Sequence, residues 1–190
     1  MNDMVTHDDI DRQFHLLRTD PQQFLALTNK LVEHYPTDRR AYFSRHWAWS
    51  HLDRADLALA DLDRSLALEE NFVVHRAKGR LLHRMEFYKK AIASLDRCEQ
   101  MDPASWPEAL GPLIRADCHA QLGNEAAALA DCETLPDDHW TPGVFGLPAG
   151  NKQEVADELR RRATVANASA GDLREGTTAK PSAGKADGIQ

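Results

Sequence analysis

Apolar residues recur at helical spacing from residue 39 to residue 72, the stretch around which the rest of the chain is organised. Its first half carries Tyr42, Trp49 and Leu52, and its second half carries Leu57, Ala58, Leu62, Leu66 and Leu68. A polar run, residues 53–56, separates the two halves. The pattern predicts two amphipathic helices joined by a short turn. Because a helical hairpin of this size cannot bury its own apolar faces, it needs neighbours of the same kind.

The small-residue position at Ala58 recurs farther along the chain. The segments LALADLDRSLAL, KKAIASLDRCEQ and AAALADCETL align on Ala58, Ala91 and Ala128, at spacings of 33 and 37 residues. Self-similarity at such a period is typical of stacked helix pairs. Leu, Ala and Arg, which favour helix, are common, whereas Val and Ile are sparse. We therefore expect an all-α protein built from about three helix pairs.

The aligned segments resemble the tetratricopeptide repeat (TPR) family. The first unit, residues 39–71, carries Tyr42, Trp49, Ala58, Ser65 and the closing pair Asn71-Phe72. The second, residues 72–105, carries Gly79, Leu82, Tyr88, Ala91, Cys98 and Asp102-Pro103. The third, residues 106–136, carries Ala116, Leu122-Gly123, Ala128 and Leu135-Pro136. The resemblance implies a right-handed superhelical solenoid of about three TPR helix pairs with N- and C-terminal capping helices. Arg45-His46 and Glu70 depart from the family pattern.

The flanking segments are expected to close the two ends of the stack. Residues 1–38 predict an N-terminal helical cap or degenerate repeat, with helices over 7–18 and 21–34. Residues 137–150 are rich in Pro and Gly and predict an ordered loop that packs Trp140, Val144, Phe145 and Leu147 on the last helix pair. Residues 151–166 predict a C-terminal capping helix that starts at a capping box. The tail, residues 167–190, lacks periodicity and is expected to be disordered.

Composition narrows the function classes. The formal net charge of −7 argues against general nucleic-acid binding, which depends on neutralising phosphates. No apolar run reaches the roughly 20 residues that span a bilayer, so we expect no membrane insertion. The polar, acidic start of the chain is unlike a secretory signal peptide, and we expect a cytoplasmic protein. The three cysteines form no CxxC pair and are expected to be free buried thiols.

Positive charge gathers on two predicted first helices of this acidic chain. Residues 39–52 and 72–85 contain no Asp or Glu. The register of groove-lining positions that the resemblance implies selects Arg40, Phe43, Trp47, His51, Arg76, Arg80, His83 and Arg84, with Ser44 beside them and Leu113, Ile114, Asp117 and Gln121 from the third unit. Arginine can hold a carboxylate bidentately, and the aromatic residues can supply an apolar anchor. We expect a cationic groove for an acidic or carboxylate-bearing peptide of a protein partner, unless these arginines are solvated and pair with neighbouring acids.

Three readings of function stay open. The first is a non-catalytic adaptor or chaperone-like module. The second is a self-associating scaffold subunit, with a homodimer as its simplest form. The third is a metal-dependent enzyme that uses His46, His51, His75 and His83. We rank the adaptor first, with no catalytic residue, metal site or cofactor, because HExxH, CxxC and Gly-rich phosphate motifs are absent from the sequence. The carboxylate-clamp subtype of the family is disfavoured because Ser44 and Trp47 stand where it uses asparagine.

Overall fold

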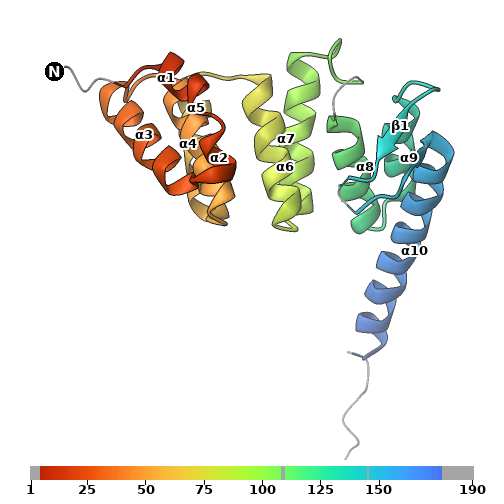
Figure 1. Cartoon of the computed structure of the whole chain (residues 1–190). Helices are drawn as coiled ribbons and strands as arrows, with labels where there is room; N and C mark the ends of the chain where they lie inside the picture. Colours follow the sequence, from red (N-terminus) through yellow and green to blue (C-terminus); the bar gives the residue numbers. More distant parts are fainter. Residues whose placement is uncertain (1–4, 108–109, 145, 177–190) are drawn as a thin grey trace, which may run out of the picture.

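The computed structural model describes residues 5–107, 110–144 and 146–176. Ten helices and two short strands lie within these residues (Figure 1). The helices are α1 His7–Arg12, α2 Leu16–Thr19, α3 Pro21–His34, α4 Arg39–His51, α5 Ala55–Leu68, α6 Phe72–Arg84, α7 Tyr88–Met101, α8 Gly111–Gln121, α9 Glu125–Glu133 and α10 Lys152–Gly176. The strands are β1 Trp140–Pro142 and β2 Ala149–Asn151. The expectation of an all-α protein is therefore confirmed, apart from one small hairpin.

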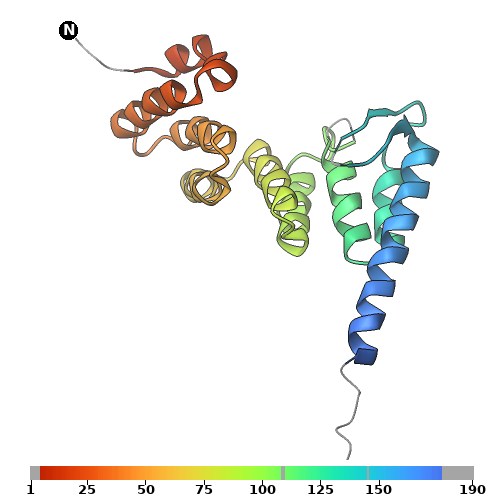
Figure 2. The same ribbon diagram turned by 60° about the horizontal axis from the view of Figure 1, so that its bottom comes forward.

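Helices α4 to α9 form three pairs that follow one another in chain order. Helix α4 packs on α5, α6 on α7, and α8 on α9, while α5 contacts α6 and α7 contacts α8. Helix α3 packs on α4 at one end, and α10 packs on α8 and α9 at the other (Figures 1 and 2). The C-terminal half of α10 projects beyond the pairs (Figure 1). Each pair thus buries its apolar faces against its neighbours, as the sequence pattern requires.

Equivalent positions of the three pairs have equivalent environments. The aligned alanines are all fully buried in the second helix of their pair: Ala58, Ala91 and Ala128. One residue with positive φ lies in the turn of each pair, again at spacings of 33 and 37: Asp53 (φ 57°), Glu86 (φ 61°) and Gly123 (φ 75°). Only the third of these is a glycine, the residue that adopts this conformation without steric cost. The repeat therefore extends from the sequence to the backbone geometry of the turns.

Several helix starts follow signals that the sequence carries. The side chain of Asp20 accepts a hydrogen bond from the backbone N–H of Gln23 at 3.0 Å, and Pro21 occupies the first turn of α3. Pro112 lies in the first turn of α8, where its missing N–H is not needed. Asn151 and Glu154 form the expected reciprocal cap at the start of α10.

The N-terminal segment differs from the single helix predicted over residues 7–18. The chain turns between α1 and α2, at residues 13–15. This break lets Ile10 on α1 and Leu17 on α2 both enter the core that α3 and α4 share. Phe14 lies at the break, and its side chain is 48% exposed.

The Pro/Gly segment folds into a β-hairpin that the sequence pattern did not predict. Strands β1 and β2 pair antiparallel, with Thr141 opposite Gly150. Leu147 is buried and Val144 packs beside it against the last helices, as expected. The same expectation for Trp140 is wrong, because its side chain is 64% exposed. Alternate strand residues point to opposite faces, so burying Thr141 directs Trp140 outward. Phe145 lies outside the described residues.

The C-terminal helix is longer than predicted. Helix α10 continues ten residues past the expected end at residue 166, so the first part of the predicted disordered tail is helical. No proline interrupts residues 152–176, and Ala, Leu, Arg and Glu there favour helix. The Asn167 side chain also donates to the Gly123 carbonyl at 3.0 Å, which ties α10 to the turn of the third pair. The rest of the predicted tail, residues 177–190, lies outside the described residues.

Two remaining expectations concern composition. All three cysteines, Cys98, Cys118 and Cys132, are free and buried, and burial raises the pKa of each thiol. Across the described ranges, no helix combines the length and apolar character that crossing a bilayer requires.

Candidate functional site

Two neighbouring cavities lie between α4 and α6. The histidine cavity has a volume of about 330 Å³ and is lined by His46, Ser50, Ala77, Arg80, Leu81, His83 and Arg84. The tryptophan cavity has a volume of about 350 Å³ and is lined by Phe43, Trp47, Val73, Arg76, Ala77, Arg80, Leu110 and Ile114. Ala77 and Arg80 belong to both linings. We call the two together the α4–α6 cleft.

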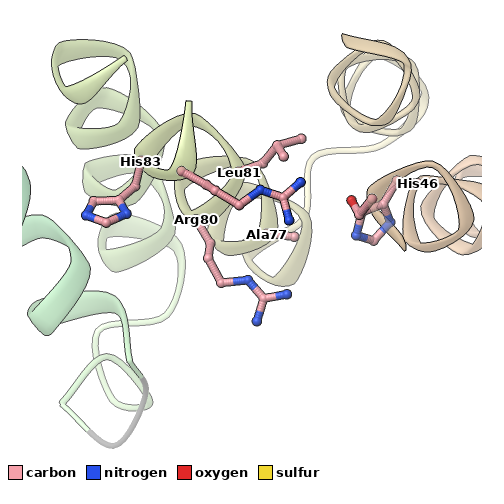
Figure 3. Close-up of a pocket in the computed structure, with 7 residues that line it drawn as sticks. His46, Ala77, Arg80, Leu81 and His83 are labelled. Carbon is pink, nitrogen blue, oxygen red and sulfur yellow. The ribbon is translucent and has the colours of Figure 1, made fainter. Parts of the chain in front are cut away.

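Helical spacing explains why these residues meet. On α6, positions 73, 76, 77, 80 and 84 are three or four residues apart and therefore share one face. His46 on α4 lies across the histidine cavity from α6, while His83 lies on the side of α6 toward α8 (Figure 3). Leu110 and Ile114 close the tryptophan cavity from the start of α8. The cleft is therefore built by the first helices of successive pairs.

Six of the eight residues selected from the sequence line the cleft: Phe43, Trp47, Arg76, Arg80, His83 and Arg84. The other two line neither cavity. Arg40 is exposed in the first turn of α4. His51 is exposed at the last residue of the same helix, where its Nδ1 lies 2.9 Å from the Trp47 carbonyl oxygen. The sequence pattern did not single out Ser50, Val73, Ala77, Leu81 or Leu110, and it offered His46 as one of the basic residues of its helix and as a metal ligand. Their shared helical face with the selected residues was the available signal.

Arg76, Arg80 and Arg84 lie on successive turns of α6, and we call them the arginine row. No described carboxylate forms an ion pair with any of them. Three other cations of the first two pairs have ion pairs: Arg39 with Glu69 at 3.1 Å, Arg45 with Asp61 at 2.7 Å and Lys78 with Asp63 at 2.6 Å. The expectation of pairing with neighbouring acids thus holds for these three cations, whereas the arginine row is partly exposed and has no ion pair to a described carboxylate.

Arg80 stands at the centre of the cleft. Its guanidinium carbon lies 5.3 Å from the centre of the Trp47 ring, within the range of a cation–π interaction. Partial burial, followed by repulsion from Arg84 and Arg76, lowers the pKa of Arg80. Arginine remains charged at neutral pH even so, because its ordinary pKa is above 12. The cleft therefore concentrates positive charge that has no anionic partner among the described residues.

His46 contributes an aromatic surface rather than a charge. Its side chain is 3% exposed, and its ring centre lies 4.6 Å from those of both Phe43 and Trp47. Its Nδ1 contacts the Phe43 carbonyl oxygen. Burial lowers the pKa of His46 from its usual 6.5 to about 4, so the ring is neutral at pH 7. The cationic character of the histidine cavity comes mainly from Arg80 and Arg84.

His83 connects the cleft to the C-terminal helix. Its Nε2 lies 2.6 Å from Oδ2 of Asp117 on α8, which is 1% exposed. Arg162 on α10 donates to the other Asp117 oxygen at 2.5 Å and to Glu158 at 2.8 Å. Hydrogen bonds from Arg161 and Arg162 lower the pKa of Glu158 to about 2. We call the group of His83, Asp117 and Arg162 the Asp117 bridge.

The histidines of the metal-enzyme alternative lie in separate environments. His46 is enclosed by aromatic rings, His51 is exposed, and His83 is engaged by Asp117. His75 lies 2.7 Å from the carboxylate of Glu70 on the far side of α6. Within the residues that the structure describes, no group of three or more His, Cys, Asp or Glu side chains is placed to hold a metal ion.

Comparison of the chain with models of known protein families, with curated proteins and with solved structures finds no match. The resemblance to the TPR family therefore depends on the residues quoted above.

Proposed function

We propose that this protein is a non-catalytic interaction module, adaptor or chaperone-like, that binds an acidic or carboxylate-bearing peptide segment of a partner protein in the α4–α6 cleft. The observation that carries the proposal is the arginine row. Three arginines follow one another on the cleft face of α6 without an ion pair to a described carboxylate, while Arg39, Arg45 and Lys78 nearby are neutralised.

The energetics of the row favour an anionic ligand. Like charges four residues apart on a helix repel each other by about 0.2–0.5 kcal/mol per pair. Carboxylates of a ligand would relieve this repulsion and could accept bidentate hydrogen bonds from the guanidinium groups. Phe43 and Trp47 add the aromatic surface that commonly anchors a partner at an interface. A peptide fits better than a nucleic acid, because the chain as a whole carries a net charge of −7.

We also propose that the three helix pairs are TPR-like units of a right-handed solenoid. The buried alanines and the positive-φ turn residues, both at spacings of 33 and 37, support this proposal. In such an arrangement first helices line one surface, which is consistent with a cleft built from α4, α6 and α8. Repeat proteins use extended surfaces of this kind for binding.

A direct binding measurement tests the proposed function. The probe is a fluorescein-labelled hexaglutamate peptide, followed by fluorescence anisotropy at an ionic strength of about 0.15 M. A row variant changes Arg76, Arg80 and Arg84 to Glu. A control variant makes the same change in net charge at exposed cations outside the cleft, namely Arg18, Lys30 and Lys89.

We expect saturable binding to the wild type and the control variant, and loss of binding in the row variant. Circular dichroism establishes that both variants keep the helical content of the wild type. Equal loss in both variants would show that only the overall charge matters. Absence of binding to all three proteins would remove the basis for an acidic ligand.

A further inference from the structure

The arginine row has a spacing that a ligand must match. Arg76, Arg80 and Arg84 are each four residues apart on one helix, which corresponds to about 6 Å along the helix axis per step. Rows of residues four apart are inclined by about 26° to the axis, so one step along the row is about 6.7 Å. A peptide that follows the backbone spacing of the row presents carboxylates at this interval.

An extended chain meets this requirement with acids at every second position. Each residue of an extended chain advances about 3.3 Å, so two residues advance about 6.6 Å. Side chains two residues apart also point to the same face of the chain. Acids at every position would place half of the carboxylates on the wrong face, and acids at every third position would be about 10 Å apart.

A helical ligand can present carboxylates at the same interval. A helix with its side chains is about 10–12 Å wide. An extended segment is narrower, and its successive side chains can enter the two adjoining cavities, which share Ala77 and Arg80 in their linings. We therefore favour the extended form.

We infer that the cleft recognises an extended peptide segment of the form acid-x-acid-x-acid, with the central carboxylate on Arg80 and the outer two on Arg76 and Arg84. This inference rests on the proposed function and names the class of segment that the cleft takes. Arg80 is the residue that sets the register. It lies between the other two arginines, it lines both cavities, and the Trp47 ring beneath it holds its guanidinium in place.

The test uses three labelled peptides of identical length and composition. Each contains three Glu residues among Ser and Ala, spaced by two, three or four positions. Anisotropy titrations with the wild-type protein should show the spacing-of-two peptide binding about tenfold more tightly than the spacing-of-three peptide, because the latter loses at least one charge-assisted pair. The spacing-of-four peptide, which suits a helix, should also bind about tenfold more weakly.

A double-mutant cycle then tests the register. The protein change is Arg80→Gln, and the peptide change replaces the central Glu by Gln. The two changes should be strongly non-additive, because each removes the same ion pair. Replacing an outer Glu should instead be additive with Arg80→Gln. Arg80 is only partly buried, so its substitution is compatible with folding, which circular dichroism checks.

Each remaining outcome contradicts the inference in a different way. Tightest binding of the spacing-of-four peptide would show that the ligand is helical. Equal binding of the three peptides would show that the cleft binds negative charge without distinguishing the spacing of the carboxylates. That result would overturn the inference and leave the proposed function standing. Failure of all three peptides and of hexaglutamate to bind would overturn both.

Discussion

The Asp117 bridge makes a specific prediction about how the C-terminal helix is held. Asp117 is almost fully buried, and its two oxygens accept separate partners, His83 from α6 and Arg162 from α10. The substitution Asp117→Asn keeps the size and shape of the side chain and removes its charge. It therefore probes the electrostatic part of the bridge with little change in packing.

The expected cost follows from the two short contacts. A hydrogen bond that involves a charged group contributes about 1.5–3 kcal/mol, compared with about 0.5–1.5 kcal/mol for a neutral one. Weakening one such bond costs about 1–1.5 kcal/mol, and the lower desolvation cost of a neutral Asn offsets part of it. Only the Arg162 bond joins α10 to α8, whereas the His83 bond joins α6 to α8. Arg162 also keeps its bond to Glu158 at 2.8 Å. We therefore expect a net loss of about 1 kcal/mol in the free energy that holds α10 on α8, and a similar loss in the contact between α6 and α8.

Native-state hydrogen exchange followed by mass spectrometry resolves where this loss occurs. Local opening of α10 should become about fivefold more frequent, since each 1.4 kcal/mol corresponds to a factor of ten. Peptides from α3 to α5 should exchange at the wild-type rate, because these helices contact α6 or the N-terminal segment and not α10. In proteins built from repeated units, stability is approximately local, so the effect should remain confined to the C-terminal side.

A matched substitution on the exposed face of α10 provides the control. Asp157 is 63% exposed and pairs with Arg160 one turn along the same helix, so Asp157→Asn should change α10 exchange by less than about twofold. If Asp117→Asn raises exchange in α10 no more than Asp157→Asn does, the bridge does not hold the helix. A uniform rise along the whole chain would instead show that the third helix pair is not an independent unit.

Three further predictions concern buried positions. His46→Gln should flatten the pH dependence of stability. The unfolded His46 binds a proton below about pH 6.5, whereas the folded one binds it only below about pH 4. The free energy of unfolding of the wild type, measured by urea denaturation, should therefore fall by up to about 3 kcal/mol as the pH is lowered across that interval. Arg115→Met should cost about 3–5 kcal/mol in urea denaturation, because it leaves the buried Asp131 carboxylate without its cation. Gly79→Ala should lower the melting temperature in circular dichroism by about 2–8 °C, because the added Cβ would lie 2.6 Å from Cγ of the fully buried Leu95.

Each of these predictions has its own contradicting result. A pH profile of His46→Gln that parallels the wild type between pH 6.5 and 4 would mean that another group controls that interval. For Arg115→Met, the double variant with Asp131→Leu should recover most of the loss, and no recovery would point to packing rather than charge. A Gly79→Ala variant that melts at or above the wild-type temperature would show that Leu95 can move aside.

The helix pairs could be predicted because their signals are local. Apolar spacing, the capping residues Asp20 and Asn151, and the polar run at residues 53–56 all act within one or two turns. The aligned alanines added the relation between units, and each of them is fully buried. The predicted first helices over residues 39–52 and 72–85 consequently begin where α4 and α6 begin and end within one residue of them.

The elements that could not be predicted depend on distant contacts. Trp140 is exposed because a hairpin register, fixed by the pairing of Thr141 with Gly150, decides which side chains point inward. Helix α10 continues past residue 166 where its side chains meet the turn at Gly123, 44 residues earlier in the chain. Neither relation leaves a periodic signal in the sequence.

The charges of the cleft show how the repeat could have sharpened the site prediction. Arg45 and Asp61 pair 16 residues apart, and Arg115 and Asp131 pair at the same separation in equivalent positions of the third unit. The equivalent cation of the second unit, Lys78, also pairs with an acid of α5. The side chains at the equivalent positions Arg45, Lys78 and Arg115 of the three first helices therefore point toward second helices.

Residues two positions away from Lys78 lie about 200° around α6, because each residue turns the helix by about 100°. Arg76 and Arg80 are those residues, and Arg84 follows Arg80 one turn later on the same face. The geometry that neutralises Arg45, Lys78 and Arg115 thus turns the arginine row away from the acidic second helices. For that reason the row keeps its charge available to a ligand, while Arg45, Lys78 and Arg115 are neutralised within the fold.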